Sequence, residues 1–268
     1  MSSFATSSDG TRIGYSIEGS GPAVILVAGA MQFRGFDSTT AAMATLLAAR
    51  GYTVINYDRR GRGESAQAPS FTLADTLDDL RALIEVAGGS AALFGNSSGG
   101  AISLAAAAAG LPVSALVLWE VPLREELGTD SAEFLAGLQQ RIAGEDPDDV
   151  IAYFMKDMPP EWLEGARNSP AWPVMTAMGP SLEADAESIA WTQTAPRAEL
   201  FAPITAPALA LVGEQTLPIM PPAAESIAAN VAHGRSETID AANHSWEPSV
   251  MANRIADFLS AQGQTGNN

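Results

Sequence analysis

A serine with glycines two positions away on either side stands in the pentapeptide Gly95–Gly99, which reads Gly-Asn-Ser-Ser-Gly. A continuous apolar stretch typical of a buried strand, 91–94, precedes it, and an alanine-rich stretch typical of a helix, 99–109, follows it. A sharp turn from strand to helix exposes the hydroxyl of the central serine and points the helix N-terminus at it, where developing negative charge is stabilised. The pattern therefore predicts that Ser97 is a nucleophile. The alternative is a Gly/Ser-rich loop in which Ser97 or Ser98 only caps the helix.

A serine nucleophile needs a base, and histidine is the usual one. The chain has two histidines. His244 follows the last strand-like stretch, 237–239, and precedes the last helix-like stretch, 248–259. His233 stands beside Gly234 near the end of a predicted helix, where a solvated histidine is the ordinary explanation. We therefore expect His244 to be the base.

Strand-like and helix-like stretches alternate along most of the chain. Apolar runs, continuous or alternating, predict strands at 12–17, 23–27, 52–57, 91–94, 115–119, 208–212 and 237–239. Apolar residues at helical spacing predict helices at 39–50, 72–86, 99–109, 223–232 and 248–259. This alternation predicts an α/β fold with a mostly parallel central sheet and helices on both faces.

The segment 122–203 breaks the alternation, since it combines helix-like pieces with frequent proline and many Met, Trp, Tyr and Phe residues. We interpret it as a helical cap, or lid, inserted into a core formed by 1–121 and 204–260. Its large side chains either pack the cap helices together or line an apolar pocket over Ser97. The polar tail, 261–268, is expected to be flexible.

Together these features resemble the α/β-hydrolase superfamily, in particular its serine-nucleophile members with a helical cap. The resemblance covers nearly the whole chain outside the cap. The segment Tyr57–Ser65 also resembles that family's loop after the fourth strand. Its glycines, Gly61 and Gly63, indicate a tight turn, and its charges are expected to tie loops together near the site. No catalytic role is assigned to its arginines, which are Arg59, Arg60 and Arg62.

The resemblance implies an oxyanion hole made of two backbone N–H groups. One belongs to Ser98, directly after the nucleophile. The other comes from the loop after the third strand, where relatives usually carry His-Gly-x and this chain carries Ala28-Gly29-Ala30. Because the donor is a backbone group, Ala30 can still supply it, but the usual support from the histidine side chain is missing.

The acid that should orient the histidine departs from the usual pattern. Relatives most often place an aspartate after the seventh strand in a G-x-x-D turn, where this chain reads Gly213-Glu214-Gln215-Thr216. Some relatives, including certain haloalkane dehalogenases, carry the acid directly after the sixth strand, and this chain has Glu120 there. A carboxylate at the end of an apolar strand is costly without a partner, and His244 would be one. We expect Glu120 to be the acid, with Glu214, or a purely structural Glu120, as alternatives.

The implied activity is that of a serine hydrolase that cleaves carboxylic esters of small to medium apolar substrates through an acyl-enzyme. We call the sharp turn at Ser97 the elbow. Relatives that displace halide or open epoxides carry an aspartate at this position, so the serine argues against those two activities. Two alternatives stay open. One is hydrolysis of a carbon–carbon bond in a vinylogous diketone, and the other is a non-catalytic, ligand-binding member, suggested by Thr216 in place of the usual aspartate.

Composition narrows the partners and cofactors. The net charge of −17 over 268 residues disfavours nucleic acid and anionic membranes as partners. The absence of cysteine excludes disulfides, a thiolate nucleophile and a Cys-type zinc site, and two distant histidines argue against a catalytic metal. The start of the chain lacks the pattern of a secretory signal, and its longest apolar run is too short to span a bilayer. We expect a cytoplasmic monomer or homodimer that acts on a small-molecule apolar substrate without a cofactor.

Overall fold

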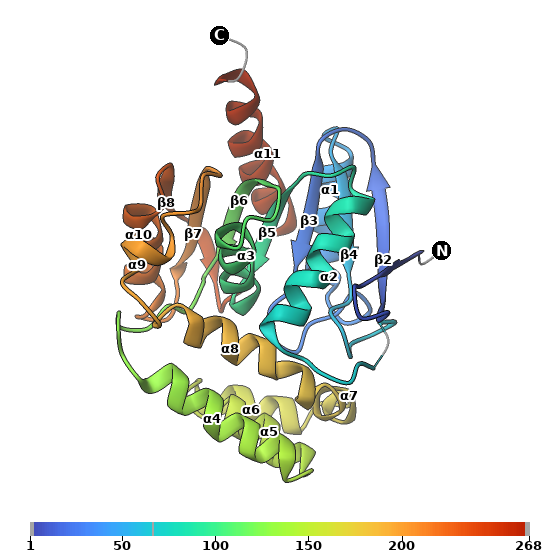
Figure 1. Ribbon diagram of the computed structural model, residues 1–268, viewed down its shortest axis with the longest axis vertical. Helices are drawn as coiled ribbons and strands as arrows, with labels where there is room; N and C mark the ends of the chain where they lie inside the picture. Colours follow the sequence, from blue (N-terminus) through green and yellow to red (C-terminus); the bar gives the residue numbers. More distant parts are fainter. Residues whose placement is uncertain (1–2, 66, 266–268) are drawn as a thin grey trace.

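The computed structural model describes residues 3–65 and 67–265. Within these residues eight strands form one sheet, in the spatial order β1-β2-β4-β3-β5-β6-β7-β8 (Figure 1). In chain order the strands are β1 (Ser3–Thr6), β2 (Arg12–Gly19), β3 (Ala23–Val27), β4 (Thr53–Tyr57), β5 (Ala91–Asn96), β6 (Val113–Trp119), β7 (Ala208–Gln215) and β8 (Gly234–Ala242). Strand β2 pairs antiparallel with β1 and β4, and all pairs from β4 to β8 are parallel. The predicted fold class is confirmed.

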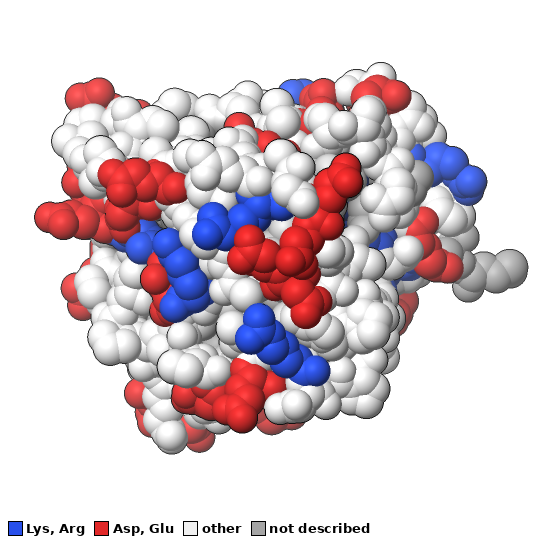
Figure 2. Space-filling model, turned by 90° about the horizontal axis from the view of Figure 1, so that it is seen from below, with Lys and Arg blue, Asp and Glu red and all other residues white. Residues whose placement is uncertain are grey.

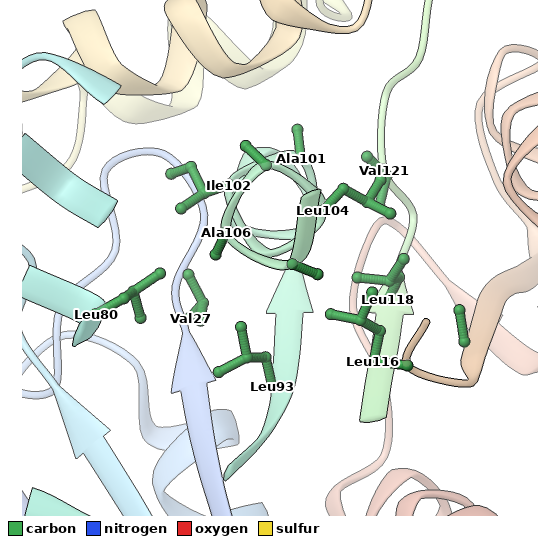
Figure 3. Packing of buried hydrophobic residues seen from close by; sticks show 14 of the residues in the cluster. Val27, Leu80, Leu93, Ala101, Ile102, Leu104, Ala106, Leu116, Leu118 and Val121 are labelled. Carbon is green, nitrogen blue, oxygen red and sulfur yellow. The ribbon is translucent and has the colours of Figure 1, made fainter. Parts of the chain in front are cut away.

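Helices cover both faces of this sheet (Figure 1). They are α1 (Ser38–Ala48) and α11 (Pro248–Thr265) on one face, and α2 (Leu73–Val86), α3 (Ser98–Ala108) and α10 (Met220–Asn230) on the other. Figure 3 shows the second face, where Leu80 of α2 and Ile102 of α3 pack over Val27, Leu93 and Leu116 of the strands. Each such fully buried side chain contributes about 1.5–3 kcal/mol to folding, so α3 and the turn that precedes it are held firmly on the sheet.

Between β6 and β7, residues 120–207 form what we call the helical insertion. Its helices are α4 (Asp130–Ala143), α5 (Pro147–Phe154), α6 (Pro160–Arg167), α7 (Trp172–Ala177), the 3₁₀ helix η1 (Gly179–Leu182), α8 (Glu183–Trp191) and α9 (Arg197–Leu200). Several of them have a proline at the first or second position, where its fixed φ and missing N–H suit the first helical turn. Helix α8 packs directly on α2 and α3, so it lies between the sheet core and α4 to α7 (Figure 1). These helices all fall within the segment predicted as a cap.

The last helix differs from its predicted bounds. Helix α11 runs from Pro248 to Thr265, so the predicted end at Leu259 is too early and 261–265 are helical. The residues beyond Leu259 include alanine and glutamine, which are good helix formers, and a polar composition did not by itself stop the helix. The remainder of the predicted tail, 266–268, lies outside the described residues.

Acidic and basic side chains are mixed on the face that the helical insertion presents (Figure 2). Arg124 forms ion pairs with Asp130 and Asp157, at 2.9 and 3.1 Å, and Arg141 pairs with Asp149 at 3.3 Å. The charges of Arg124 and Arg141 are thus offset by neighbouring carboxylates. None of the helices within the described ranges has the length and apolar character needed to cross a membrane.

Candidate active site

Ser97 occupies the sharp turn between β5 and α3. Its backbone has φ 54° and ψ −125°, a conformation that L-residues adopt only under constraint. Its N–H donates to the carbonyl of Trp119 at 2.8 Å, which fixes the turn to the end of β6. The Ser97 hydroxyl makes no helix-capping hydrogen bond with the described residues, so the helix-cap alternative does not describe its role. The backbone strain at Ser97 therefore does not serve to cap helix α3.

The two glycines of the pentapeptide are required by close backbone packing. A Cβ on Gly95 would lie 2.5 Å from the Cα of Gly100, and one on Gly99 would lie 2.2 Å from the carbonyl oxygen of Val27. Both distances are far below van der Waals contact with backbone atoms, which cannot rotate away. The sequence pattern therefore reflects how tightly α3 approaches β3 and β5.

Replacing Gly99 with alanine is expected to destabilise the protein by about 3 kcal/mol or more, since the added methyl overlaps backbone. A matched control is Gly165→Ala on α6, where an added Cβ meets nothing within 4 Å. That change should be stabilising by up to about 1 kcal/mol, because alanine is the better helix former. Urea denaturation of the two variants measures both values, and a Gly99→Ala protein as stable as the parent would contradict the packing argument.

Glu120 and His244 are in direct contact. The Nδ1 of His244 lies 2.5 Å from Oε2 of Glu120, whose side chain is only 1 % exposed. The other carboxylate oxygen, Oε1, accepts a hydrogen bond from the backbone N–H of Gly213 at 3.0 Å. Because the carboxylate accepts from Nδ1–H, the imidazole is held in the tautomer that leaves Nε2 free to accept a proton.

The strand order explains why a glutamate serves at this position. Glu120 directly follows β6, and His244 lies two residues after the end of β8, so β7 lies between them in the sheet. Neighbouring strands are roughly 4.8 Å apart, so the side chain must pass the end of β7, and the longer glutamate suits that span. Thr216, just beyond β7, stands where relatives usually have the acid, while Glu214 is exposed to solvent. The described geometry brings Glu120, and not Glu214, to His244.

Burial alone would raise the pKa of Glu120. The contact with His244, the nearby Thr216 hydroxyl and the hydrogen bond from the Gly213 amide outweigh burial and hold the pKa below its ordinary value. The group is therefore a stable carboxylate at neutral pH, which is the form that can orient an imidazole and stabilise its protonated state.

The loop that carries His244 is fixed by backbone conformation and by aromatic packing. Asn243 and His244 both have positive φ, 56° and 57°, in the turn that ends β8. Trp246 then inserts edge-on against Phe94 of β5 and Trp119 of β6, with ring centroids 5.5 and 5.7 Å apart. Sequence reasoning did not single out Trp246, although an aromatic residue two positions after the histidine was a usable signal.

The loop between β3 and α1 lies beside the elbow. A Cβ on Gly29 would be 3.2 Å from Cβ of Ser97, so Gly29 and its neighbour Ala30 line the space over the nucleophile. Oε1 of Gln32 accepts from the backbone N–H of Gly29 at 2.9 Å and from Nδ2 of Asn96 at 2.8 Å. Gln32 thus ties the loop to the elbow and provides side-chain support where the expected histidine is missing.

A cavity of about 320 Å³ lies over the elbow. Ala30, Ser97, Ser98 and His244 are among its lining residues, as expected for the candidate nucleophile, base and oxyanion donors. Most of the remaining lining is apolar and comes from the helical insertion and from the segment after β7: Phe134, Phe154, Met155, Met158, Trp162, Ile189, Leu217, Ile219 and Met220. Both readings of the large insertion side chains hold, since Met175 and Met178 instead pack inside the insertion.

The second histidine stands apart from this group. His233 is exposed in the turn between α10 and β8, and its carbonyl accepts from the N–H of Ala208. The site thus combines a strained serine at a strand-to-helix turn, a histidine held by a buried glutamate, and a largely apolar cavity lined by the serine and the histidine. On a mostly parallel sheet with helices on both faces, this arrangement defines the class of α/β hydrolases.

Comparison with known proteins agrees with that class. Residues 24–258 match the family described as "Alpha/beta hydrolase family", so the chain belongs to the α/β-hydrolase family. The comparison with curated proteins gives no significant match.

Solved structures of similar fold are numerous. An α/β hydrolase from Sphaerobacter thermophilus is 33 % identical, with a TM-score of 0.82 over 96 % of this chain and 100 % of that one. A hydrolase from Pseudomonas aeruginosa is 26 % identical, with a TM-score of 0.71 over 96 % of this chain and 98 % of that one. A thermophilic esterase from Thermogutta terrifontis is 24 % identical, with a TM-score of 0.73 over 98 % of this chain and 99 % of that one, and shows the shared fold.

Proposed function

We propose that the protein is a serine hydrolase that cleaves carboxylic esters of small to medium apolar acids or alcohols. The observation that carries the proposal is that Ser97 and His244 line one largely apolar cavity, while the buried Glu120 contacts His244. Family membership supports hydrolysis, and esterases occur among the proteins that share the fold. An enol-lactonase and a putative non-heme bromoperoxidase share the fold as well, so the fold does not specify the reaction. We propose ester hydrolysis because of the residues at the site.

In the proposed mechanism, Oγ of Ser97 attacks the ester carbonyl while Nε2 of His244 takes the hydroxyl proton. Glu120 holds the imidazole and stabilises its protonated form. The N–H groups of Ala30 and Ser98 donate to the oxyanion of the tetrahedral intermediate. That intermediate collapses to the acyl-enzyme, and His244 gives the proton to the departing alkoxide. Water, activated by His244, then adds to the acyl carbonyl, and the acid leaves as Ser97 recovers its proton.

The helical insertion acts in this proposal as a lid that supplies the apolar wall of the substrate site. Phe134, Phe154 and Trp162 come from three of its helices and line the cavity. An apolar wall of this kind binds hydrocarbon parts of a substrate and excludes water from the oxyanion. The substrate is a small molecule, and the chain's net charge of −17 disfavours polyanionic ones.

The proposal is tested by labelling and by substrate profiling of the intact protein. A fluorophosphonate probe should give one covalent adduct per chain by mass spectrometry, and p-nitrophenyl acetate and butyrate should be hydrolysed faster than the negatively charged half-ester of succinate. Turnover of a vinylogous diketone without ester hydrolysis would assign carbon–carbon bond cleavage instead. Absence of both adduct and turnover would indicate a ligand-binding member.

A further inference from the structure

A buried ion cluster adjoins the candidate oxyanion hole and is not used by the proposed chemistry; one member, Asp185, is among the residues that line the cavity. Asp185 of α8 pairs with Arg59 and with Arg62, each at 2.5 Å. The three side chains are at most 2 % exposed. Two guanidinium groups and one carboxylate leave an excess of one positive charge out of contact with solvent. Buried charges are costly unless paired and hydrogen-bonded, so this cluster calls for a specific explanation.

The cluster contacts both segments that are expected to donate to the oxyanion. Nη1 of Arg62 donates to the carbonyl of Gly29 at 2.7 Å, and the Ser98 hydroxyl donates to Asp185 at 2.6 Å. The Gly29 carbonyl and the Ala30 N–H belong to the same planar peptide group and point in opposite directions. A guanidinium held on the carbonyl therefore fixes the direction of the N–H and polarises it, which makes it a stronger donor.

We propose that Arg62 is a positioning residue for the oxyanion hole and that Asp185 holds it in place, so that the helical insertion and the hole are assembled as one unit. This inference rests on the proposed function. Arg62 does not touch substrate; it acts through the Gly29–Ala30 peptide.

The remaining contacts of Arg62 join the insertion to the same peptide. Its Nε donates to Oγ of Ser181 at 2.8 Å, and its Nη2 donates to the Ser181 carbonyl at 3.2 Å. Ser181 and Asp185 both belong to the helical insertion, in η1 and α8. All three guanidinium nitrogens are therefore used, which a lysine ammonium, a compact charge without the planar fork, cannot reproduce.

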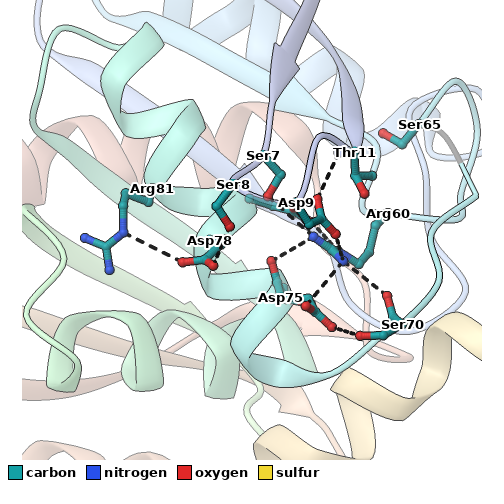
Figure 4. Close-up of polar contacts among 12 residues, drawn as sticks. Ser7, Ser8, Asp9, Thr11, Arg60, Ser65, Ser70, Asp75, Asp78 and Arg81 are labelled. Carbon is teal, nitrogen blue, oxygen red and sulfur yellow. Dashed lines mark hydrogen bonds and ion pairs between the residues drawn. The ribbon is translucent and has the colours of Figure 1, made fainter.

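Arg60 provides a matched control, because it is an equally buried arginine from the same loop with a different task. It pairs with Asp79 at 2.6 Å. It also pairs with Asp9 at 3.2 Å and donates to the Ser70 carbonyl at 3.1 Å (Figure 4). These partners join α2 to the β1–β2 turn, and none of them lines the cavity. Arg60 thus forms buried ion pairs, as Arg62 does, but makes no contact with the Gly29–Ala30 peptide.

The experiment compares Arg62→Lys with Arg60→Lys. For each variant, the thermal midpoint, kcat and KM for p-nitrophenyl butyrate, and the inhibition constant of a trifluoromethyl ketone are measured. The ketone adds reversibly to Ser97 and places its oxyanion in the hole, so its affinity reports the hole directly. Both variants should lose thermal stability. Arg62→Lys should lower kcat by roughly 10- to 100-fold and weaken the ketone by a similar factor, with KM within threefold, while Arg60→Lys stays within twofold in all three.

Ser181→Ala is the second variant. It tests the positioning role of Arg62 if Arg62→Lys does not fold. It removes one acceptor of Arg62 and no charge, and it should lower kcat and ketone affinity together by about threefold or more. If kcat and ketone affinity stay within twofold in a folded Arg62→Lys, or in Ser181→Ala, Arg62 has a structural role only and the inference is overturned. A parent protein without ester hydrolysis and without a fluorophosphonate adduct would instead overturn the proposed function.

Discussion

Ser97→Ala is expected to lower kcat for ester hydrolysis by roughly 10⁴-fold or more and to abolish the fluorophosphonate adduct. The reason is that no other hydroxyl can take over at this turn: the strained backbone of Ser97 presents its Oγ to the cavity, whereas the neighbouring Ser98 hydroxyl is committed to Asp185. The stability of the folded state should change little, because the Ser97 hydroxyl makes no helix-capping hydrogen bond with the described residues and the backbone strain is the same in serine and alanine. Mass spectrometry and steady-state kinetics measure the two effects.

Ser103→Ala is the matched control for this change. Ser103 lies in the same helix, is fully buried, and donates its hydroxyl to the carbonyl of Gly99 at 2.7 Å, away from the cavity lining. We expect its kcat to stay within about threefold of the parent and its adduct to form normally. An adduct that persisted in Ser97→Ala, or that vanished in Ser103→Ala, would place the nucleophile elsewhere.

Glu120→Gln is expected to lower kcat by about 10³- to 10⁴-fold with KM little changed. The glutamine carbonyl can still accept from the Gly213 N–H, so the loop after β7 should keep its place. What changes is the contact with His244, where an amide N–H₂ would now face Nδ1 and favour the tautomer that places the proton on Nε2. In that form the imidazole cannot accept the proton of Ser97. Kinetics over a range of pH measures the loss.

The control for Glu120→Gln is Glu214→Gln, which alters an exposed carboxylate in the turn where relatives usually carry the acid. We expect this variant to keep kcat within twofold of the parent. A large loss in Glu214→Gln, together with near-normal turnover in Glu120→Gln, would assign the acid to Glu214. Equal and small effects in both would mean that His244 works without an orienting carboxylate.

Much of the fold could be predicted because its signals are local. The apolar runs at 23–27 and 91–94 correspond to β3 and to most of β5, and helical periodicity placed α2 within one residue of its observed start. The boundary at the C-terminal end was less predictable, since α11 continues to Thr265 through a stretch in which alanine and glutamine favour a helix and glycine does not. Element type follows from short-range pattern, whereas element ends depend on packing that a window of sequence does not contain.

By itself, the sequence determined the turn at Ser97, because the need for glycine at Gly95 and Gly99 comes from backbone atoms a few residues away or on the adjoining strand. It also indicated His244 and Glu120, since both follow strands whose carboxyl ends meet at one edge of a parallel sheet. The tertiary structure decided which carboxylate reaches the histidine, because that depends on the order β6-β7-β8 and on the length of one side chain. Only the tertiary structure shows that Arg62 pairs with Asp185, which lies 123 residues further along the chain. A pairing over that distance leaves no periodicity in the sequence, because it exists only when α8 packs against the core.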